Sequence, residues 1–516
     1  MAEKSEANGR VINRRRFLQW GALTLGAVAV NACTSAPAAA PTAAPRAEAT
    51  QAGAPAAPTP TTATTGATTA QPVEILFNTW WTPLQDAFTV LIKEFQDQNP
   101  GVTVKTQFIT TDYAQAMAAA LTAGTFGDAA TSDNGVQSKW QSGGYHYDLT
   151  AYVDQDKLNL QKDYSLGGLE IWCGKVMNLP MDADDRAIYY NKTMLKEAGA
   201  PDPWDDLKGN WTWDDLVKIG KACTKKDASG KIVQYGFQTT YTDTEDNEGF
   251  IWSLGGNYAD WTTGKYNYLD PAVIKAWEMM YDWATKDQFL ITQDAISSLT
   301  GATGVNPFRA GIVAMYLRAS YDSTINEKEI GNKFEWDAAP FPKPGSYNPK
   351  GEATPPTTAN PNFVPKAAKH PEEGYKFLAY LCGDRAEQLY AQKKTMMVAK
   401  KSAWKTYQDT PPPKHAGSFV WYVYGRPHGY HYYSDIMNEV MYSTVQPEIE
   451  KAFLGQQTIK QALETAQKKI DTLGKSQSAP CDNPYGQNAS PQPPLPQDEL
   501  DALGVKPYFP YEWANQ

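Results

Sequence analysis

The sequence is poor in cysteine and histidine and lacks the common catalytic motifs. Its 516 residues include only five Cys and five His, and no CxxC, HExxH, GxSxG, GxGxxG or Walker loop occurs. His428 and His431 are three residues apart, but no cysteine or carboxylate accompanies them at ligand spacing. Acidic residues outnumber basic ones, 57 to 47, which disfavours a nucleic-acid partner. We therefore expect no metal ion, no cofactor and no nucleic acid.

The sequence also lacks an apolar run long enough to span a membrane permanently. The run Trp20–Val30 is too short, and it follows Asn-Arg-Arg-Arg-Phe-Leu-Gln at 13–19, which is typical of a twin-arginine export signal. The run ends in Val-Asn-Ala-Cys, with Cys33 last, which resembles a lipobox. We interpret residues 1–33 as a twin-arginine lipoprotein signal lipidated at Cys33. An ordinary cleaved signal with an incidental cysteine is the alternative.

Residues 34–71 have almost no charge and no large apolar side chain. Ala, Pro, Thr and Ser dominate this segment, and such a composition cannot bury a core. We expect a disordered tether. Signal, cysteine and tether in this order predict an exported protein of the cell envelope, anchored through Cys33 to the outer face of the bacterial cytoplasmic membrane.

Four cysteines remain after Cys33. Cys173, Cys223, Cys382 and Cys481 form no metal or redox motif. An even number in an exported chain permits two disulfides with three possible connectivities. Free buried thiols are equally compatible with the sequence, because twin-arginine substrates often fold before export, in a reducing compartment.

From Val73 onward the chain alternates strand-like and helix-like segments. The patterns predict strands at 73–81 and 102–109 and helices at 84–98 and 113–123. This alternation continues along a chain long enough for two or more domains. It predicts an α/β fold with mostly parallel sheets and helices on both faces.

The stretch 174–198 has the pattern of a crossover between two such domains. An apolar run at 176–179 breaks at Pro180, passes three aspartates beside Arg186, and continues as an apolar strand at 187–190. A helix follows from about Lys192 and stops at Gly199. Ligand sites of two-domain proteins usually lie at such a crossover.

Several stretches, taken in order, resemble the family 1 extracellular solute-binding proteins of ABC transporters, the group that contains maltose-binding protein. Each stretch alone is loose, but five in order over about 400 residues, roughly 73–475, form a specific pattern. They are the strand ending in Trp80-Trp81 with the helix and NPGVTVK turn behind it; Gly127-Asp128 with Asp133 and 144–150; 174–192 with the WTWDDL segment 211–216; 308–321; and 363–381 with the closing helices.

The resemblance implies a two-lobed, periplasmic-binding-protein-like (type II) α/β fold with a ligand cleft between the lobes. Each lobe would be a mostly parallel sheet flanked by helices. The first lobe would comprise 73–182 plus 318–370, and the second 186–317 plus 373–475. Residues 476–516, rich in Pro and Gln, would form a C-terminal extension.

The first candidate ligand contacts lie at predicted strand ends, where open α/β sheets bind ligands. Trp80 and Trp81 end the first strand; one would stack on a sugar ring, and the other belongs to the core. Asp133 follows the third strand, either as a hydrogen-bonding partner of sugar hydroxyls or as a helix cap.

Polar residues of the crossover form the second group of candidate contacts. Asp182, Asp184 and Arg186 either bind the ligand or form a surface salt-bridge cluster. The remaining candidates match segments that contact the solute in the resembled family, and only one to three of their aromatic rings can be true contacts. They are Trp252, Gly255, Gly256, Tyr316, Arg318, Tyr321, Trp421 and Tyr432.

We therefore expect a monomeric binding lipoprotein that captures a sugar or oligosaccharide by hinge closure and delivers it to an ABC transporter permease. The abundance of aromatics, 16 Trp, 29 Tyr and 17 Phe, also favours a carbohydrate ligand, although packing accounts for most of them. Two alternatives stay open: a secreted carbohydrate-active enzyme with paired carboxylates such as Asp133 and Asp184, and a binding protein for a non-sugar solute.

Overall fold

The computed structural model describes residues 72–507, apart from 133–134, 167–168, 261–262, 302–304, 432–433 and 474–491. These residues belong to one compact unit, Thr69–Gln516. The predicted signal with Cys33, the tether, Cys481, Asp133 and Tyr432 lie outside the described residues. Within them, Cys173 is disulfide-bonded, whereas Cys223 and Cys382 are free and buried.

The first sheet has four strands in the order β14-β3-β1-β2. Parallel pairing joins β1 to β2 and β3, and β14 is antiparallel to β3. The bounds are β1 Val73–Thr79, β2 Val102–Phe108, β3 Ala129–Thr131 and β14 Asn362–Phe363. Ile75 and Phe77 of β1 are fully buried, because alternate strand residues face the helices that cover the sheet.

Two helices of this first lobe agree with the ranges predicted from apolar periodicity, 84–98 and 113–123. Helix α2 begins at Gln85, one residue after the predicted start, and ends before the turn at Asn99-Pro100-Gly101, where Gly101 has a φ of +102°. The bounds are α2 Gln85–Gln98, α3 Tyr113–Ala123, α4 Gln137–Ser142, α5 Thr150–Asp156, α6 Leu160–Asp163, α13 Pro371–Leu381 and α14 Asp384–Lys393.

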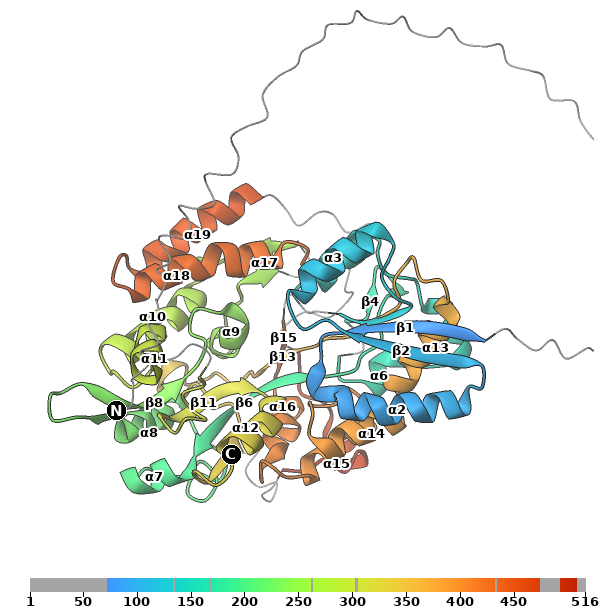
Figure 1. The fold of residues 1–516 in the computed structure, drawn as a ribbon. Coiled ribbons are helices and arrows are strands. Elements are labelled where there is room, and N and C mark those ends of the chain that lie inside the picture. The colour runs from blue at the N-terminus through green and yellow to red at the C-terminus, as the bar shows by residue number, and fades with distance from the viewer. Residues whose placement is uncertain are drawn as a thin grey trace, which may run out of the picture. The chain divides into compact units, whose positions relative to one another are not determined.

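The second sheet has seven strands and is mixed. Its order is β15-β13-β6-β11-β8-β7, with β12 also paired to β6. Parallel pairs join β11 to β8 and β13 to β15, whereas β6 is antiparallel to β11, β12 and β13. The bounds are β6 Asp184–Asn191, β7 Lys225–Lys226, β8 Ile232–Gln238, β11 Val313–Ala319, β12 Trp336–Ala339, β13 Pro356–Thr358 and β15 Gly429–Tyr430. Figure 1 shows this green-to-yellow sheet beside the blue strands of the first.

The helices of the second lobe begin with α7, at the predicted Lys192. Helix α8 begins after Thr212, which forms a full capping box with Asp215. A π-helical turn, Met441–Val445, separates α17 from α18. The other bounds are α7 Lys192–Ala198, α8 Trp213–Cys223, α9 Thr244–Ser253, α10 Pro271–Thr285, α11 Gln293–Thr300, α12 Asp322–Ile330, α17 Met437–Val440, α18 Gln446–Phe453 and α19 Ile459–Leu473.

The predicted lobe boundaries need correction at two places. Strands β11 and β12 pair in the second sheet. The prediction places the end of β11 and all of β12 in the first lobe, within the segment 318–370. Helix α13, predicted in the second lobe, packs against β1, β3 and α2 of the first. The reason is that β11 pairs with β8 through its first residues and with β6 through its last ones, so the chain leaves the second sheet only after β13.

Two neighbouring segments connect the sheets. Leu179 and Asn362 exchange backbone hydrogen bonds of 2.7 and 2.9 Å beside the first sheet, and Asp184 pairs with Thr358 in the second. Between these points the Asp182 carboxylate accepts hydrogen bonds from the backbone and side-chain nitrogens of Asn360, at 2.6 and 3.3 Å. The predicted crossover is thus a pair of antiparallel strands joined by Asp182.

The C-terminal part contains a short helix, α20 (Gln497–Ala502), packed against the chain near α15 (Trp404–Asp409). Leu500 and Val505 are buried, and Glu499 pairs with Lys401 at 2.6 Å. Within the described residues, no helix is both long and apolar enough to cross a membrane.

Candidate functional site

A cavity of about 450 Å³ lies where the crossing segments meet the two sheets. Its walls come from the end of β1, from β6, from the start of α9, from the end of β11 and from the π-helical turn. The lining residues are Trp80, Trp81, Thr82, Pro83, Asp184, Arg186, Asp243, Glu245, Asp246, Arg318, Tyr321, Ile325, Asn360 and Tyr442. Six of the predicted ligand contacts are among them.

Two tryptophans form the wall contributed by the first lobe. Trp80 and Trp81 stack on each other with ring centroids 4.8 Å apart and planes 9° from parallel. Trp81 is 4% exposed and belongs to the core, whereas Trp80 is half-buried and donates its indole N–H to the Ser132 carbonyl at 3.2 Å. The burial of Trp81 agrees with the predicted core ring, and Trp80 stays the candidate for the ring that stacks on a sugar.

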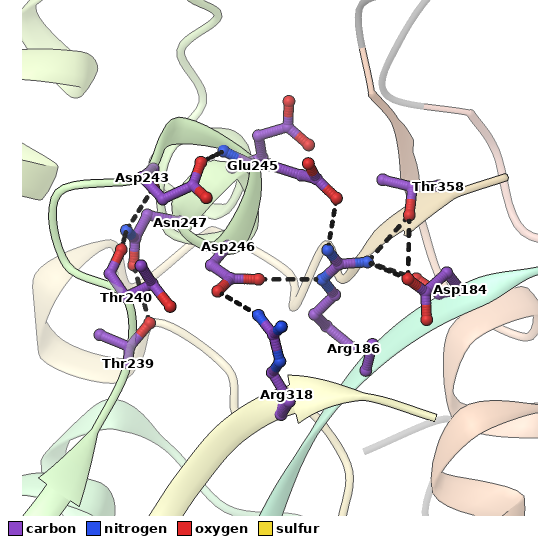
Figure 2. Close-up of polar contacts among 12 residues, drawn as sticks. Asp184, Arg186, Thr239, Thr240, Asp243, Glu245, Asp246, Asn247, Arg318 and Thr358 are labelled. Atoms are coloured by element: carbon purple, nitrogen blue, oxygen red, sulfur yellow. Dashed lines mark hydrogen bonds and ion pairs between the residues drawn. The ribbon is translucent and has the colours of Figure 1, made fainter. Parts of the chain in front are cut away.

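Arg186 is the centre of a buried ion network on the opposite wall (Figure 2). Its guanidinium contacts the carboxylates of Glu245 at 2.6 Å, Asp246 at 3.3 Å and Asp184 at 3.5 Å. It also donates to the Thr358 hydroxyl of β13 at 3.0 Å. A single side chain on β6 therefore connects α9 to the crossing segments.

Arg318, on β11, is the second cation of this wall. It donates to the second oxygen of Asp246 at 2.9 Å and to the Tyr321 hydroxyl at 2.5 Å. Figure 2 shows Asp246 between the two guanidiniums. The two arginines lie on adjacent antiparallel strands, where Arg186 pairs with Ala319, the residue after Arg318.

The first turn of α9 supplies the acids that face these arginines. Asp243 caps the helix by accepting from the Glu245 backbone N–H at 2.9 Å. Every residue of α9 is buried, including four charged or amide side chains. Carboxylates at this end are stabilised by the helix dipole, and the arginines balance part of their charge.

Burial and neighbouring charge shift the pKa of these groups in opposite directions. Burial raises the pKa of Asp184 to about 7 and that of Asp243 to about 8. For Glu245 and Asp246 burial acts in the same sense, but the arginines outweigh it and lower the pKa of both. The cavity therefore combines two firmly ionised carboxylates with two that gain a proton easily.

The structure does not bring five of the predicted contacts to this cavity, which is a correction to the sequence analysis. Trp252, Tyr316 and Trp421 are buried in the core, at 4, 6 and 6% exposure. Gly255 follows the end of α9 with a φ of +84°, and at Gly256 a Cβ atom would lie 2.3 Å from that of Ala272. Helix termination and close packing account for these glycines.

Asp182 lies beside the cavity without lining it. Its hydrogen bonds to Asn360 join the crossing strands, so the structure places it at the connection between the sheets. Burial, with the nearby Asp184, raises the pKa of Asp182 well above its ordinary value.

Sequence reasoning missed the acids of α9, Asn360 and Tyr442. The run Thr-Asp-Thr-Glu-Asp-Asn-Glu at 242–248 was the available signal, because such a dense acidic run directly after a strand marks a helix start at a sheet edge. No comparable signal marks Tyr442, whose hydroxyl donates to Glu245 at 3.2 Å.

The two histidines singled out in the sequence have separate partners. His431 contacts Glu248 at 2.6 Å, and His428 contacts the Arg426 carbonyl at 3.0 Å. Across the described part of the chain, no group of three His, Cys, Asp or Glu residues is arranged to hold a metal ion.

Similarity to known proteins agrees with this geometry. A putative binding protein of Brucella abortus is 25% identical over 300 residues, 57% of this chain and 68% of that protein. The multiple sugar-binding protein of Streptococcus mutans is 30% identical over 133 residues, 25% of this chain and 28% of that protein.

Solved structures confirm the predicted two-lobed α/β fold. An ABC substrate-binding protein of Listeria monocytogenes in complex with cycloalternan has a TM-score of 0.67 at 20% identity, covering 78% of this chain and 98% of that one. The maltose/maltodextrin-binding domain of Bdellovibrio bacteriovorus bound to maltotriose has a TM-score of 0.62 at 15% identity, covering 78% and 99%. Residues 81–388, more than half of the sequence, match the bacterial extracellular solute-binding protein family. The chain therefore belongs to that family.

Proposed function

We propose that this protein captures a carbohydrate in the cavity between its lobes and delivers it to the permease of an ABC transporter. The observation that carries the proposal is the pairing of an aromatic wall, Trp80, with a wall of carboxylates and guanidiniums, Asp184 to Arg318, in one cavity. A sugar ring has apolar C–H faces, which suit an indole. Its hydroxyl rim suits charged hydrogen-bonding groups.

Hinge closure is the proposed mechanism. Both lobes contribute to the cavity, so a solute contacts all of its walls only when the lobes are close together. A ligand shifts an open–closed equilibrium by its difference in affinity for the two states. The crossing strands joined by Asp182 and Asn360 are the proposed hinge.

Binding explains the site better than hydrolysis. A glycosidase needs two carboxyl groups free to act on the glycosidic bond. Here Asp184, Glu245 and Asp246 each contact Arg186, an arrangement that orients hydroxyl groups. The family and the similar structures are likewise binding proteins.

We further propose export by the twin-arginine signal, lipid attachment at Cys33, and action as a monomer. These proposals rest on the sequence of residues 1–71 and on the extracellular character of the family.

The test is a thermal-shift screen of a sugar panel followed by isothermal titration, because a ligand that binds only the native state stabilises it by an amount that rises with the logarithm of its affinity. Stabilisation by at least one mono- or oligosaccharide is expected. A panel without any stabilising sugar would contradict the carbohydrate proposal, and release of cleavage products would favour the enzyme.

A further inference from the structure

The charges that line the cavity do not balance. Four carboxylates, those of Asp184, Asp243, Glu245 and Asp246, face two guanidiniums, those of Arg186 and Arg318. With all of them ionised the excess is two negative charges. A neutral sugar leaves this excess to be neutralised by protons on Asp184 and Asp243, whose pKa values burial raises, because uncompensated charge is costly once closure removes water from the cavity.

Neither arginine is available to an anionic ligand. Arg186 is already in contact with three carboxylates, and Arg318 with Asp246 and the Tyr321 hydroxyl. A carboxylate or phosphate on the solute would therefore lie against acids whose counter-ions are already used. This disfavours uronic acids and sugar phosphates.

Asp243 is the acid with room for a cation. It makes no ion pair within the described part of the chain, and its hydrogen bond is to the Glu245 backbone N–H. It is half-buried and lines the cavity. Tyr442, which also lines the cavity, donates to Glu245, and aromatic rings such as those of Trp80 and Tyr442 attract cations by their faces.

We propose that the captured carbohydrate carries a protonated amine, as an oligosaccharide of 2-amino sugars does, and that Asp243 receives the ammonium group. The inference rests on the proposed carbohydrate function and goes beyond it in naming the class of sugar. The ammonium takes the place of the proton that otherwise neutralises Asp243.

Proton release gives this proposal a distinctive signature. Burial raises the pKa of Asp243 to about 8, so its carboxyl is largely protonated at pH 7 in the free protein. An ammonium group beside it favours the ionised form. Binding of an amino sugar that enters as the ammonium therefore expels the Asp243 proton to solvent, whereas an amine that enters uncharged would take up that proton itself; binding of an uncharged sugar expels none.

The experiment compares β-1,4-linked trimers of glucosamine, N-acetylglucosamine and glucose with a trimer of glucuronic acid. Isothermal titration is done at pH 5.5, where the amines of the trimer enter as ammonium groups and Asp243 is still protonated, in two buffers of different ionisation enthalpy. The glucosamine trimer is expected to bind at least about tenfold more tightly than the other three, with proton release. Equal or tighter binding of an uncharged trimer would overturn the amine proposal and leave the carbohydrate function standing. Binding of the glucuronate trimer alone would likewise overturn the amine proposal and leave the carbohydrate function standing.

A charge-removing variant tests the residue itself. Asp243→Asn keeps a good helix cap and should lose about tenfold or more in affinity for the glucosamine trimer, together with the proton release. Asp294→Asn, in the exposed first turn of α11, is the matched control and should leave both unchanged. An unaltered glucosamine affinity in Asp243→Asn would contradict the assignment.

Discussion

At the scale of single residues, Trp80 and Trp81 show how adjacent identical side chains acquire different roles. They stack on each other, yet Trp81 is 4% exposed and packs in the core while Trp80 is half-buried. The sequence placed both at the end of β1 but could not tell which faced the cavity. That choice depends on packing against segments far away in the chain.

Truncating each tryptophan should separate binding from stability. Trp81→Ala is expected to lower the free energy of unfolding by about 3–5 kcal/mol, the usual cost of removing a buried aromatic. Trp80→Ala should weaken sugar binding by about 1.5–3 kcal/mol, with a smaller loss of stability. Denaturant unfolding and isothermal titration measure the two effects. Equal losses of stability in both variants would show that Trp80 is simply a core residue.

Asp185, next to the cavity acids, should make stability depend on pH. It is fully buried, its hydrogen-bond donor is the Tyr424 hydroxyl at 3.2 Å, and burial raises its pKa to about 8 from 3.8. The folded state therefore holds a proton that the unfolded state loses. The resulting stability is complete below pH 3.8 and is lost as the pH rises toward and through 8.

Asp185→Asn removes this titration while keeping the shape of the side chain. Urea unfolding at pH 5 and pH 8.5 should show a smaller loss of stability between the two values in Asp185→Asn than in the wild type. Burial also raises the pKa of Asp184 and Asp243, so both proteins lose some stability between pH 5 and pH 8.5. The contribution of Asp185 is the amount by which this loss is smaller in Asp185→Asn than in the wild type. The control Asp294→Asn should lose as much stability between pH 5 and pH 8.5 as the wild type does. If Asp185→Asn loses as much too, Asp185 is not a source of the pH dependence.

At the scale of elements, the sequence predicted best the helices whose apolar residues have helical spacing. The predicted bounds of α3, 113–123, coincide with those observed, and α7 begins at the predicted Lys192. The start of helix α9, Thr244–Ser253, was not predicted. Its first turns are buried but polar, so hydrophobic spacing, the main signal for a helix, was absent there.

Helix α20 is an element that its composition did not predict. The extension beyond 475 is rich in Pro and Gln, but Leu500 is 1% exposed and Glu499 pairs with Lys401. Leu500→Ala is expected to lower the free energy of unfolding by about 2–5 kcal/mol. Leu454→Ala, at a leucine that is 56% exposed, is the control and should be nearly neutral. A neutral Leu500→Ala would mean that α20 adds nothing to the fold.

At the scale of the whole binding unit, the order of motifs predicted the two lobes and the family, whereas the division of the chain between the lobes was wrong in part. The sequence shows where strands are but not which sheet each joins. The antiparallel position of β6 among β11, β12 and β13 depends on pairings between residues more than a hundred positions apart. Such pairings leave no local pattern.

One ion pair links helices that belong to different lobes. Lys139 of α4 contacts Glu439 of α17 at 3.0 Å, with both side chains largely exposed. Lys139→Glu would place two like charges there and should weaken solute binding a few-fold, since exposed pairs contribute up to about 1 kcal/mol. The double reversal Lys139→Glu with Glu439→Lys should restore the affinity.

Isothermal titrations of the solute at low and high salt provide the check, because salt screens exposed charges and should reduce the loss of affinity in Lys139→Glu. If the double variant binds as weakly as the single one, the pair has no part in closure.

The π-helical turn at 441–445 sets the direction in which side chains before it point around the helix axis, relative to those of α18. Tyr442 lies within this turn and reaches Glu245 in the cavity wall. Because each residue of an α-helix advances about 100° around its axis, deleting one residue to restore regular winding would rotate everything before the deletion relative to α18. The last aromatic of the cavity is thus positioned by helical register, and a one-residue deletion could retune recognition without changing any side chain.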